Sequence, residues 1–286
     1  MQTHPIRYPT DLTNEEWDYI KSLVPVPKSG KGKRGRPALE RRPLVNAIFY
    51  IVRSGCAWRL LPKDFGPWQT VYGYYRQWTK DWTWRFIHDT LRDCLRKSEK
   101  RKVAPTAAIV DSQTVKTADH AGERGYDAGK KLVGRKRHVA VDCLGLILAI
   151  MITPAAVQDR DAAKSLIQLL ITMYSRVQVI WADGGYLGRL VQWVKQLRPF
   201  GKLHLEIVRR SDRAKGFKVL PKRWIVERTF GWFNRYRRLS KDYEHNPKSS
   251  ETWIYIAMIH RMSRFSLPEK NKDDDLLKRP PKRRKT

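Results

Sequence analysis

The spacing of apolar residues changes near Pro105 from a helical to a strand pattern, and this change limits the possible folds more than any other feature of the sequence. Before it, apolar residues recur at helical spacing, as at Leu44, Ile48 and Val52. After it, they come in short runs rich in β-branched residues, which are typical of strands. The chain is therefore predicted to combine an all-helical region with a later region that contains a sheet.

Helices are expected throughout the first hundred residues. Thr13 and Glu16 have the spacing of a capping box, which opens a helix that Pro25 closes. Further helices are expected at 44–55, 71–78 and 82–95. Short helices with tight turns and a basic linker at 28–42 are typical of small DNA-binding modules. We assign residues 1–100 to a helical, helix-turn-helix-like DNA-binding domain.

The second region has the pattern of an α/β domain. Strands are expected at 107–110, 138–142, 146–152, 177–182 and 203–208. The first three are expected to be antiparallel, because Gly145 sits in a tight turn between the second and the third. Helices are expected at 161–174, 186–197, 223–239 and 251–262. This order predicts a mixed five-stranded sheet flanked by helices over residues 105–265, followed by a basic, disordered tail at 266–286.

The charge of the chain points to a polyanionic partner. Its 286 residues include 58 Lys and Arg against 28 Asp and Glu, which leaves a net charge of +30. The basic residues form separate blocks at 28–42, 209–241 and 278–285, and aromatic residues are interleaved with the second block. Blocks spread along a folded chain fit a long double-stranded DNA better than a membrane surface.

Membrane and disulfide-rich classes are excluded by the sequence pattern. The longest apolar run, 146–152, is far shorter than the roughly 20 residues that cross a bilayer, and no signal-peptide pattern is present. Cys56, Cys94 and Cys143 are odd in number and widely spaced, so neither a disulfide framework nor a structural zinc site is supported. We expect a cytoplasmic protein.

Three carboxylates stand where a neutral or apolar residue is more usual. Asp111 and Asp183 each end an expected strand, and Glu227 lies inside a basic, aromatic helix. A carboxylate at the end of a buried strand must be paired, hydrogen-bonded or bound to metal. If the first and fourth strands are parallel neighbours, the two aspartates meet at one edge of the sheet. Three such carboxylates can hold two Mg²⁺ or Mn²⁺ ions about 3.5–4 Å apart for phosphodiester chemistry.

Each carboxylate also has an ordinary interpretation. Asp183 with two following glycines fits a turn, and Asp111 fits a turn cap. Glu227 fits an ion pair with Arg223 one helical turn earlier. The combination of the three, in a chain of net charge +30, is what favours a metal site.

Several segments resemble the DDE transposases of bacterial insertion sequences, in the group named after insertion sequences four and five. The segments are 58–62 (WRLLP), 65–68 (FGPW), 110–113 (VDSQ), 134–138 (GRKRH), 182–186 (ADGGY), 226–232 (VERTFGW) and 243–244 (YE). The resemblance extends from Tyr8 to Arg264. It implies a ribonuclease H-like catalytic core in which Asp111, Asp183 and Glu227 are the catalytic and metal-binding triad.

The family pattern around the glutamate is incomplete in this chain. The group carries a tyrosine seven residues before the glutamate, an arginine four before and a lysine seven after; here these positions hold Leu220, Arg223 and Asn234. The matching Arg223 is expected to hold a DNA phosphate or to position Glu227. The handling of the terminal nucleotides, including any hairpin step, stays open.

Other basic residues are candidates for DNA contact. Arg34 and Arg36 match a hook that enters the minor groove of AT-rich DNA, with a basic interdomain linker as the favoured alternative. The segment of Arg135, Lys136 and Arg137 is either a phosphate contact or a solvated hairpin edge. On and after the glutamate helix, the candidates are Arg228, Arg235, Arg237 and Arg238.

These features lead to one main hypothesis. A bacterial, nucleoid-associated transposase would bind terminal inverted repeats, cleave the transposon ends by metal-dependent hydrolysis and join the 3′-hydroxyl ends to target DNA. Because two ends must be cut in concert, we expect a homodimer or a higher oligomer on DNA. The alternatives are a ribonuclease H-like nuclease without strand transfer and a non-catalytic DNA-binding regulator descended from a transposase.

Overall fold

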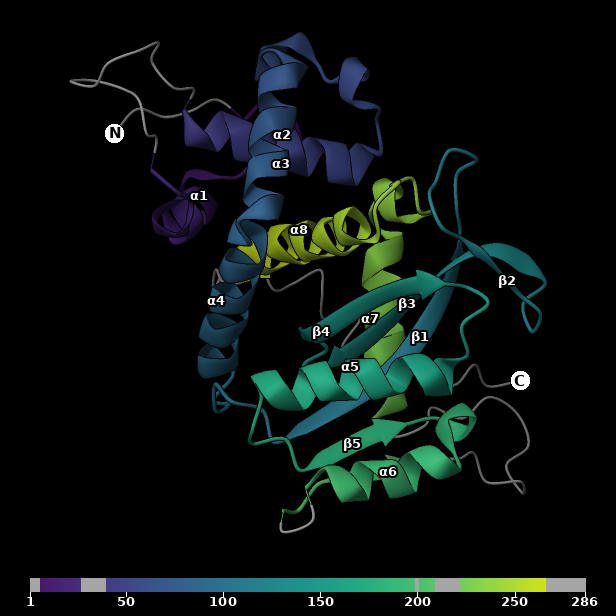
Figure 1. Cartoon of the computed structure of the whole chain (residues 1–286). Helices are drawn as coiled ribbons and strands as arrows, with labels where there is room; N and C mark the ends of the chain where they lie inside the picture. Colours follow the sequence, from purple (N-terminus) through teal and green to yellow (C-terminus); the bar gives the residue numbers. More distant parts are fainter. Residues whose placement is uncertain (1–5, 27–39, 199–200, 209–221, 266–286) are drawn as a thin grey trace, which may run out of the picture. The chain divides into compact units, whose positions relative to one another are not determined.

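The computed structural model describes residues 6–26, 40–198, 201–208 and 222–265 of the chain (Figure 1). The chain divides into two compact units, Met1–Leu91 with Tyr255–Thr286 and Arg92–Ile254. The end of the last helix thus groups with the N-terminal helices, whereas the expected boundary lay at residues 100–105. The basic tail and most of the basic linker fall outside the described residues. In the described part of the chain, no helix has the length and apolar character needed to span a membrane.

The first unit is helical, as predicted. It contains α1 (Asn14–Ile20), α2 (Arg41–Ser54), α3 (Trp68–Lys80), the start of α4 (Thr83–Ser98) and the end of α8 (Pro247–Phe265), with 3₁₀ turns η1 (Lys21–Leu23), η2 (Trp58–Leu60) and η3 (Lys63–Phe65). The capping box is confirmed: the Glu16 N–H donates to the Thr13 hydroxyl (3.2 Å), and the Thr13 N–H donates to the Glu16 carboxylate (2.9 Å). Gly55, with φ +73°, ends α2 as expected.

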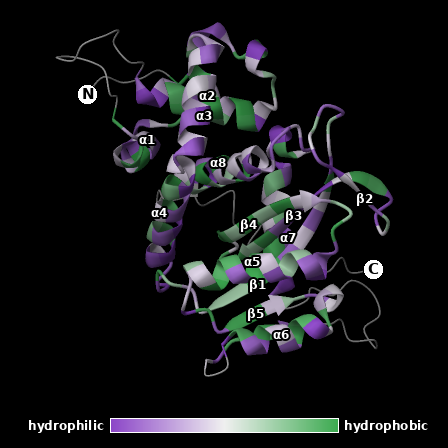
Figure 2. Ribbon diagram, in the orientation of Figure 1, coloured by the Kyte–Doolittle hydropathy of each residue, from purple (hydrophilic) through white to green (hydrophobic). Residues whose placement is uncertain are grey.

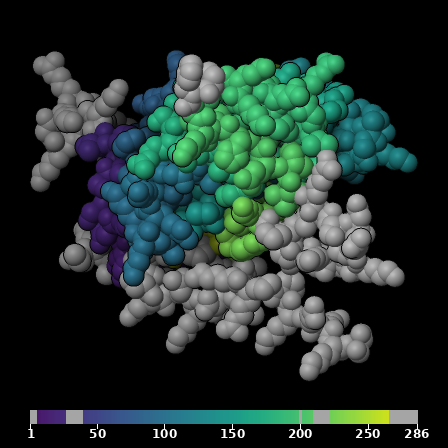
Figure 3. Space-filling view, turned by 90° about the horizontal axis from the view of Figure 1, so that it is seen from below, coloured from purple at the N-terminus to yellow at the C-terminus, as the bar shows by residue number. Residues whose placement is uncertain are grey.

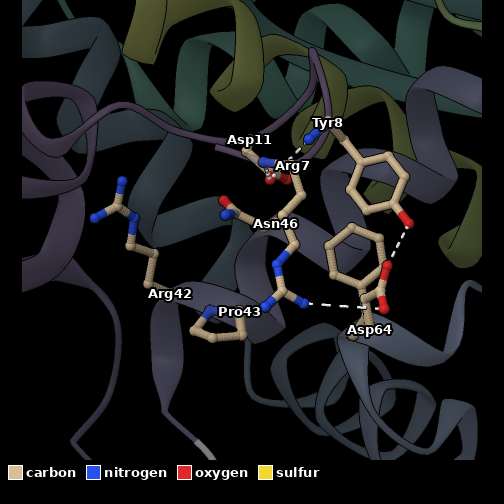
Figure 4. Close-up of a pocket in the computed structure, with 8 residues that line it drawn as sticks. Arg7, Tyr8, Asp11, Arg42, Pro43, Asn46 and Asp64 are labelled. Carbon is tan, nitrogen blue, oxygen red and sulfur yellow. Dashed lines mark hydrogen bonds and ion pairs between the residues drawn. The ribbon is translucent and has the colours of Figure 1, made fainter. Parts of the chain in front are cut away.

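A pocket of about 150 Å³ lies in this helical unit (Figure 4). The Tyr8 hydroxyl donates to Asp64 (2.8 Å), and Asp11 accepts the backbone N–H groups of Arg7 and Tyr8 (3.0 and 3.1 Å). The Leu12 N–H donates to Asn46 of α2 (3.2 Å). These bonds tie the segment before α1 to α2, so we assign the pocket a structural role.

The second unit is built on a mixed sheet. Its strands are β1 (Ala107–Lys116), β2 (Gly125–Asp127), β3 (Leu132–Val141), β4 (Ile147–Pro154), β5 (Val179–Ala182) and β6 (His204–Ile207). β3 pairs antiparallel with both β1 and β4, and β5 pairs parallel with both β1 and β6. The five expected strands and the antiparallel arrangement of the first three are confirmed. The additional strand β2, which pairs with the start of β3, was missed because three residues beginning with glycine carry no strand pattern.

The two faces of the sheet are covered by different helices. α5 (Asp159–Met173) and α6 (Arg189–Leu197) cover one face, where Ala108, Val110 and Ile180 join the hydrophobic core. α7 (Arg223–Asn234) contacts β1 and lies behind the sheet in Figure 1. Hydrophobic residues dominate strands such as β4 and β5 in Figure 2. Because side chains alternate along a strand, Ile109 and Asp111 face away from the α5 and α6 core.

Two expected helices are shorter than predicted. The helix expected at 223–239 ends at Asn234 and is followed by a 3₁₀ turn, η5 (Arg237–Leu239). The helix expected at 186–197 begins only at Arg189, after the 3₁₀ turn η4 (Gly184–Tyr186). The physical reason in the second case is Gly188, whose φ of +112° is incompatible with an α-helix.

Candidate active site

The strand register brings the two expected aspartates together. In the parallel ladder between β1 and β5, Ile109 pairs with Trp181. Asp111, inside β1, and Asp183, directly after β5, each stand two residues beyond this pair, which places them at the same level and on the same face of the sheet. Asp111 accepts the N–H of Ser112, and Asp183 accepts the N–H of Gly185, both at 2.8 Å. The predicted parallel pairing that places both carboxylates at one edge is confirmed.

Helix α7 adds Glu227 to the same place. Arg223 begins this helix, and its Nη2 atom lies 3.5 Å from Glu227 Oε1 and 3.6 Å from Asp183 Oδ2. One guanidinium group thus bridges a carboxylate of α7 and a carboxylate that follows β5. The ion pair expected one helical turn before Glu227 is present, and it is shared with the aspartate.

Electrostatics connect all three carboxylates. Burial, with a smaller contribution from the nearby charges of Asp183 and Glu227, raises the pKa of Asp111 to about 6, although the Ser112 N–H and the Arg223 guanidinium oppose the rise. Asp183 and Glu227 are more open, with side chains 30% and 55% exposed. The site therefore carries a surplus of negative charge that one arginine offsets only in part.

The carboxylate oxygens of the site are donor atoms of the type that binds divalent cations. Carboxylate oxygens are the ligands that Mg²⁺ and Mn²⁺ prefer, and a cationic group, the Arg223 guanidinium, already lies between two of the three carboxylates. Within the described ranges, however, no group of three Asp, Glu, His or Cys side chains is drawn together closely enough to ligate one ion. Binding would require these side chains to move closer.

The basic segment that follows the start of β3 is internal. Arg135, Lys136 and Arg137 are 0%, 8% and 2% exposed. Arg135 faces Asp242 at 3.3 Å and donates to the carbonyl oxygens of residues 123, 244 and 245 (2.7–2.9 Å). Lys136 donates to a carbonyl oxygen (2.9 Å) and pairs with Asp159 (3.3 Å). Burial thus contradicts both the expected phosphate contact and the solvated-edge alternative, because other segments cover these side chains.

The other candidate DNA contacts lie outside the described residues, are held by contacts within the protein, or are exposed. Arg34 and Arg36 lie outside the described residues. Arg228 stacks on Trp224 and Trp232, with its guanidinium 4.6 and 4.9 Å from the ring centres, and donates to a carbonyl oxygen.

Arg238 is bound to Glu244 (2.6 Å) and lies over the Trp253 ring. Arg235 and Arg237 are exposed just after α7. Among the described arginines that we expected to touch DNA, these two are exposed, and Arg223 is partly exposed and lies between two of the three carboxylates.

Sequence reasoning missed two buried aspartates that hold the scaffold of the site. Asp142 pairs with Arg96 and accepts the N–H groups that shape the turn before β4 (2.9 Å). Asp242 pairs with Arg135 and accepts the Ser250 hydroxyl (2.8 Å). In the sequence, Asp142 ends an apolar run in the same way as Asp111, so this pattern was a signal for it, although β1 continues beyond Asp111 to Lys116. No local pattern marks Asp242.

Comparison with known proteins identifies the family of both parts of the chain. The family model of the transposase DDE domain matches residues 103–262, and a model described as a putative transposase of the IS4/5 family matches residues 12–88. The first match covers more than half of the chain and includes all three carboxylates.

Individual relatives match shorter stretches. The insertion element IS402 uncharacterized 16.2 kDa protein of Burkholderia cepacia is 28% identical over 124 residues, which are 42% of this chain and 78% of that protein. The putative transposase for insertion sequence element IS402 of the same species is 30% identical over 118 residues, 39% of this chain and 54% of that protein. The uncharacterized protein y4sN of Sinorhizobium fredii is 36% identical over 67 residues, 23% and 51% of the two chains. This chain therefore spans only about half the length of the last two relatives.

Among solved structures, the crystal structure of the Mos1 strand transfer complex matches with a TM-score of 0.31 and 13% identity, over 82% of this chain and 78% of that chain. The match of the family model over residues 103–262, with its carboxylates brought together by β1, β5 and α7, settles the assignment. The chain belongs to the family of DDE transposases of the IS4/5 type.

Proposed function

We propose that this protein binds the terminal inverted repeats of an insertion sequence, cleaves the ends by metal-dependent phosphodiester hydrolysis and joins the 3′-hydroxyl ends to target DNA. The observation that carries the proposal is the convergence of Asp111, Asp183 and Glu227 at one edge of the sheet, where the charges of the other two carboxylates help to raise the pKa of Asp111. A bound divalent cation would offset the repulsion among these carboxylates.

Each side chain has a role in this proposal. Asp111, Asp183 and Glu227 would hold the cations, because they supply the oxygen donors. Two Mg²⁺ or Mn²⁺ ions in this place would supply the Lewis acidity that activates water or a 3′-hydroxyl and stabilises the leaving oxygen. Arg223 neutralises Asp183 and Glu227 and is near enough to the site to bind a phosphate of the DNA end. The exposed Arg235 and Arg237 would bind neighbouring phosphates.

The helical unit would recognise the inverted repeats. Its match to IS4/5-type transposases and its position before the DDE domain in the chain support this role. Because both ends of the element are cut in one event, the active form would be a homodimer or a higher oligomer on double-stranded DNA. The enzyme would act in the bacterial cytoplasm, at the nucleoid.

A strand-transfer assay tests the proposal. The purified full chain is incubated with Mg²⁺, a plasmid target and labelled DNA that carries the element's own terminal repeats. We expect joined product from the wild type and from Glu99→Gln, a control that removes one exposed carboxylate at the end of α4. We expect none from Glu227→Gln, which should still bind the DNA.

The alternatives predict other outcomes of the same assay. If the wild type nicked the DNA but formed no joined product, the protein would be a nuclease without strand transfer, and the transposase proposal would be wrong. If the wild type bound the repeats specifically but neither nicked nor joined the DNA, the protein would be a non-catalytic DNA-binding regulator. Full activity of Glu227→Gln would refute the assignment of the triad.

A further inference from the structure

Strands β2 and β3 form a short two-stranded ribbon that projects from the second unit. Figures 1 and 3 both show the teal segment around β2 at the margin of this unit. Tyr126 of β2 and Val133 of β3 are paired directly across the ribbon, and their side chains are 54% and 49% exposed. An aromatic ring and a β-branched side chain thus lie side by side in solvent, where they could pack against a binding partner.

This exposed pair lies on the same face of the sheet as the candidate active site. Asp111 pairs with Val139, and the ladder between β1 and β3 runs without a register shift to Gly134. Val133 is six residues before Val139, an even number, so both side chains point to the face that carries Asp111. Six residues of extended strand span about 20 Å, which is the length of roughly six base pairs of DNA.

The ribbon is held in a fixed position. Asp127 is buried and accepts hydrogen bonds from the Thr114 hydroxyl (2.7 Å) and from the Lys130 N–H (3.0 Å). Gly134 packs so closely on β1 that an added Cβ atom would lie 1.9 Å from a backbone oxygen, and Gly125 packs on residues 155–156 in a similar way (2.6 Å). A ligand that met this ribbon would meet a preorganised surface.

Positive charge surrounds the exposed pair. Arg124, Lys130 and Lys131 are exposed at the ribbon, and the exposed Lys116 and Lys241 lie at its base, where the Asp242 N–H donates to the Lys116 carbonyl oxygen. The exposed acids of this segment are Asp119 and Glu123.

Lys131 also has a left-handed backbone, with φ +52°. Glycine would adopt this conformation with less strain, so the lysine carries a local cost in stability.

We propose that the β2–β3 ribbon is a second DNA-binding element. It binds the duplex that is being cleaved, at a position about six base pairs from the reacting phosphate. Arg124 and Lys131 bind phosphates, and Tyr126 and Val133 pack on the sugars at the edge of a groove. A two-stranded ribbon has the width to enter the major groove. This inference rests on the proposed function, because it takes the active site to be where a DNA end is cut.

Two matched double variants test the ribbon. Arg124→Gln/Lys131→Gln removes two charges from the ribbon, and Lys164→Gln/Lys195→Gln removes two exposed charges from α5 and α6, on the opposite face. Affinity for a fluorescent duplex with one terminal repeat is measured by anisotropy over a range of salt concentrations. We expect the slope of log K against log salt to fall by about 1.8 in the ribbon variant, which is about 0.9 for each lost phosphate contact. The control should keep the wild-type slope, and both should keep the wild-type melting temperature.

A crosslinking experiment locates the contact. A photoreactive benzoylphenylalanine in place of Tyr126 should crosslink about six base pairs from the cleaved bond. Equal slopes for the ribbon variant and the control, or crosslinks scattered along the duplex, would overturn the ribbon proposal while leaving the transposase proposal intact. Failure of the wild type to bind the repeat would instead refute the proposed function.

Discussion

Replacement of Asp111 by asparagine should stabilise the metal-free protein at alkaline pH. Burial and the neighbouring carboxylates raise the pKa of Asp111 from its ordinary value of 3.8 to about 6. The folded state therefore binds the proton more tightly than the unfolded state does, and ionisation destabilises the fold. One pKa unit is worth about 1.4 kcal/mol, so the full penalty is about 3 kcal/mol.

The sign of the pH dependence follows from the two pKa values. The penalty is absent well below 3.8, where both states are protonated, grows as the pH rises, and is complete above about 6. At pH 8 the asparagine variant should be more stable than the wild type by about 3 kcal/mol, and at pH 5 by about half as much. Asparagine keeps an oxygen that can accept the Ser112 N–H, so no other bond is lost.

The assay is urea unfolding followed by tryptophan fluorescence, in the presence of a chelator and at both pH values. Asp119→Asn, in an exposed loop position, is the control and should match the wild type at both. If Asp111→Asn were no more stable than the wild type at pH 8, or if its advantage did not shrink at pH 5, the unfavourable ionisation of Asp111 in the folded protein would be refuted.

Three further substitutions test the scaffold. Arg96→Met leaves the fully buried Asp142 carboxylate without its charge partner and should lower the free energy of unfolding in urea by about 3–5 kcal/mol. The second substitution Asp142→Asn, added to the first, should recover most of this stability. A loss below about 1 kcal/mol for Arg96→Met would contradict the buried pair. Gly134→Ala places a Cβ atom 1.9 Å from a backbone oxygen of β1 and should lower the melting temperature sharply. The control Gly73→Ala, in α3, adds a Cβ atom that meets no other atom within 4 Å and should be neutral or stabilising. Equal changes in melting temperature for the two variants would refute the close packing at Gly134. Lys131→Gly should raise stability by about 1 kcal/mol by relieving the positive φ while it weakens DNA binding, and a fall in melting temperature would argue against the strain.

Much of the scaffold was readable from local sequence patterns. The capping box at Thr13, the end of α2 at Gly55 and the turn at Gly145 depend on a few neighbouring residues. The expected strands follow from apolar runs that can be buried in only a few ways. The three carboxylates stand out because a charge at the end of a buried strand requires a reason, and the parallel pairing of β1 with β5 then places Asp111 beside Asp183.

The basic residues show where this reasoning stops. Arg135 and Arg137 read as surface residues, yet the backbone of residues 244–245 accepts hydrogen bonds from Arg135, and both side chains are buried. Arg223 was expected to lie near Glu227, but its second partner, Asp183, comes from a strand end 40 residues earlier in the chain. The β2–β3 ribbon escaped notice because its order depends on Asp127 and on the close packing of Gly134.

The sequence by itself therefore determined the order of helices and strands, the excess of positive charge and the choice of three carboxylates as candidates, since these are properties of short segments. Only the tertiary structure decided which charged side chains are buried and paired and which remain exposed to DNA. The physical reason is that the cost of burying a charge depends on the partners that distant segments bring to it, and a run of basic residues carries no record of those partners.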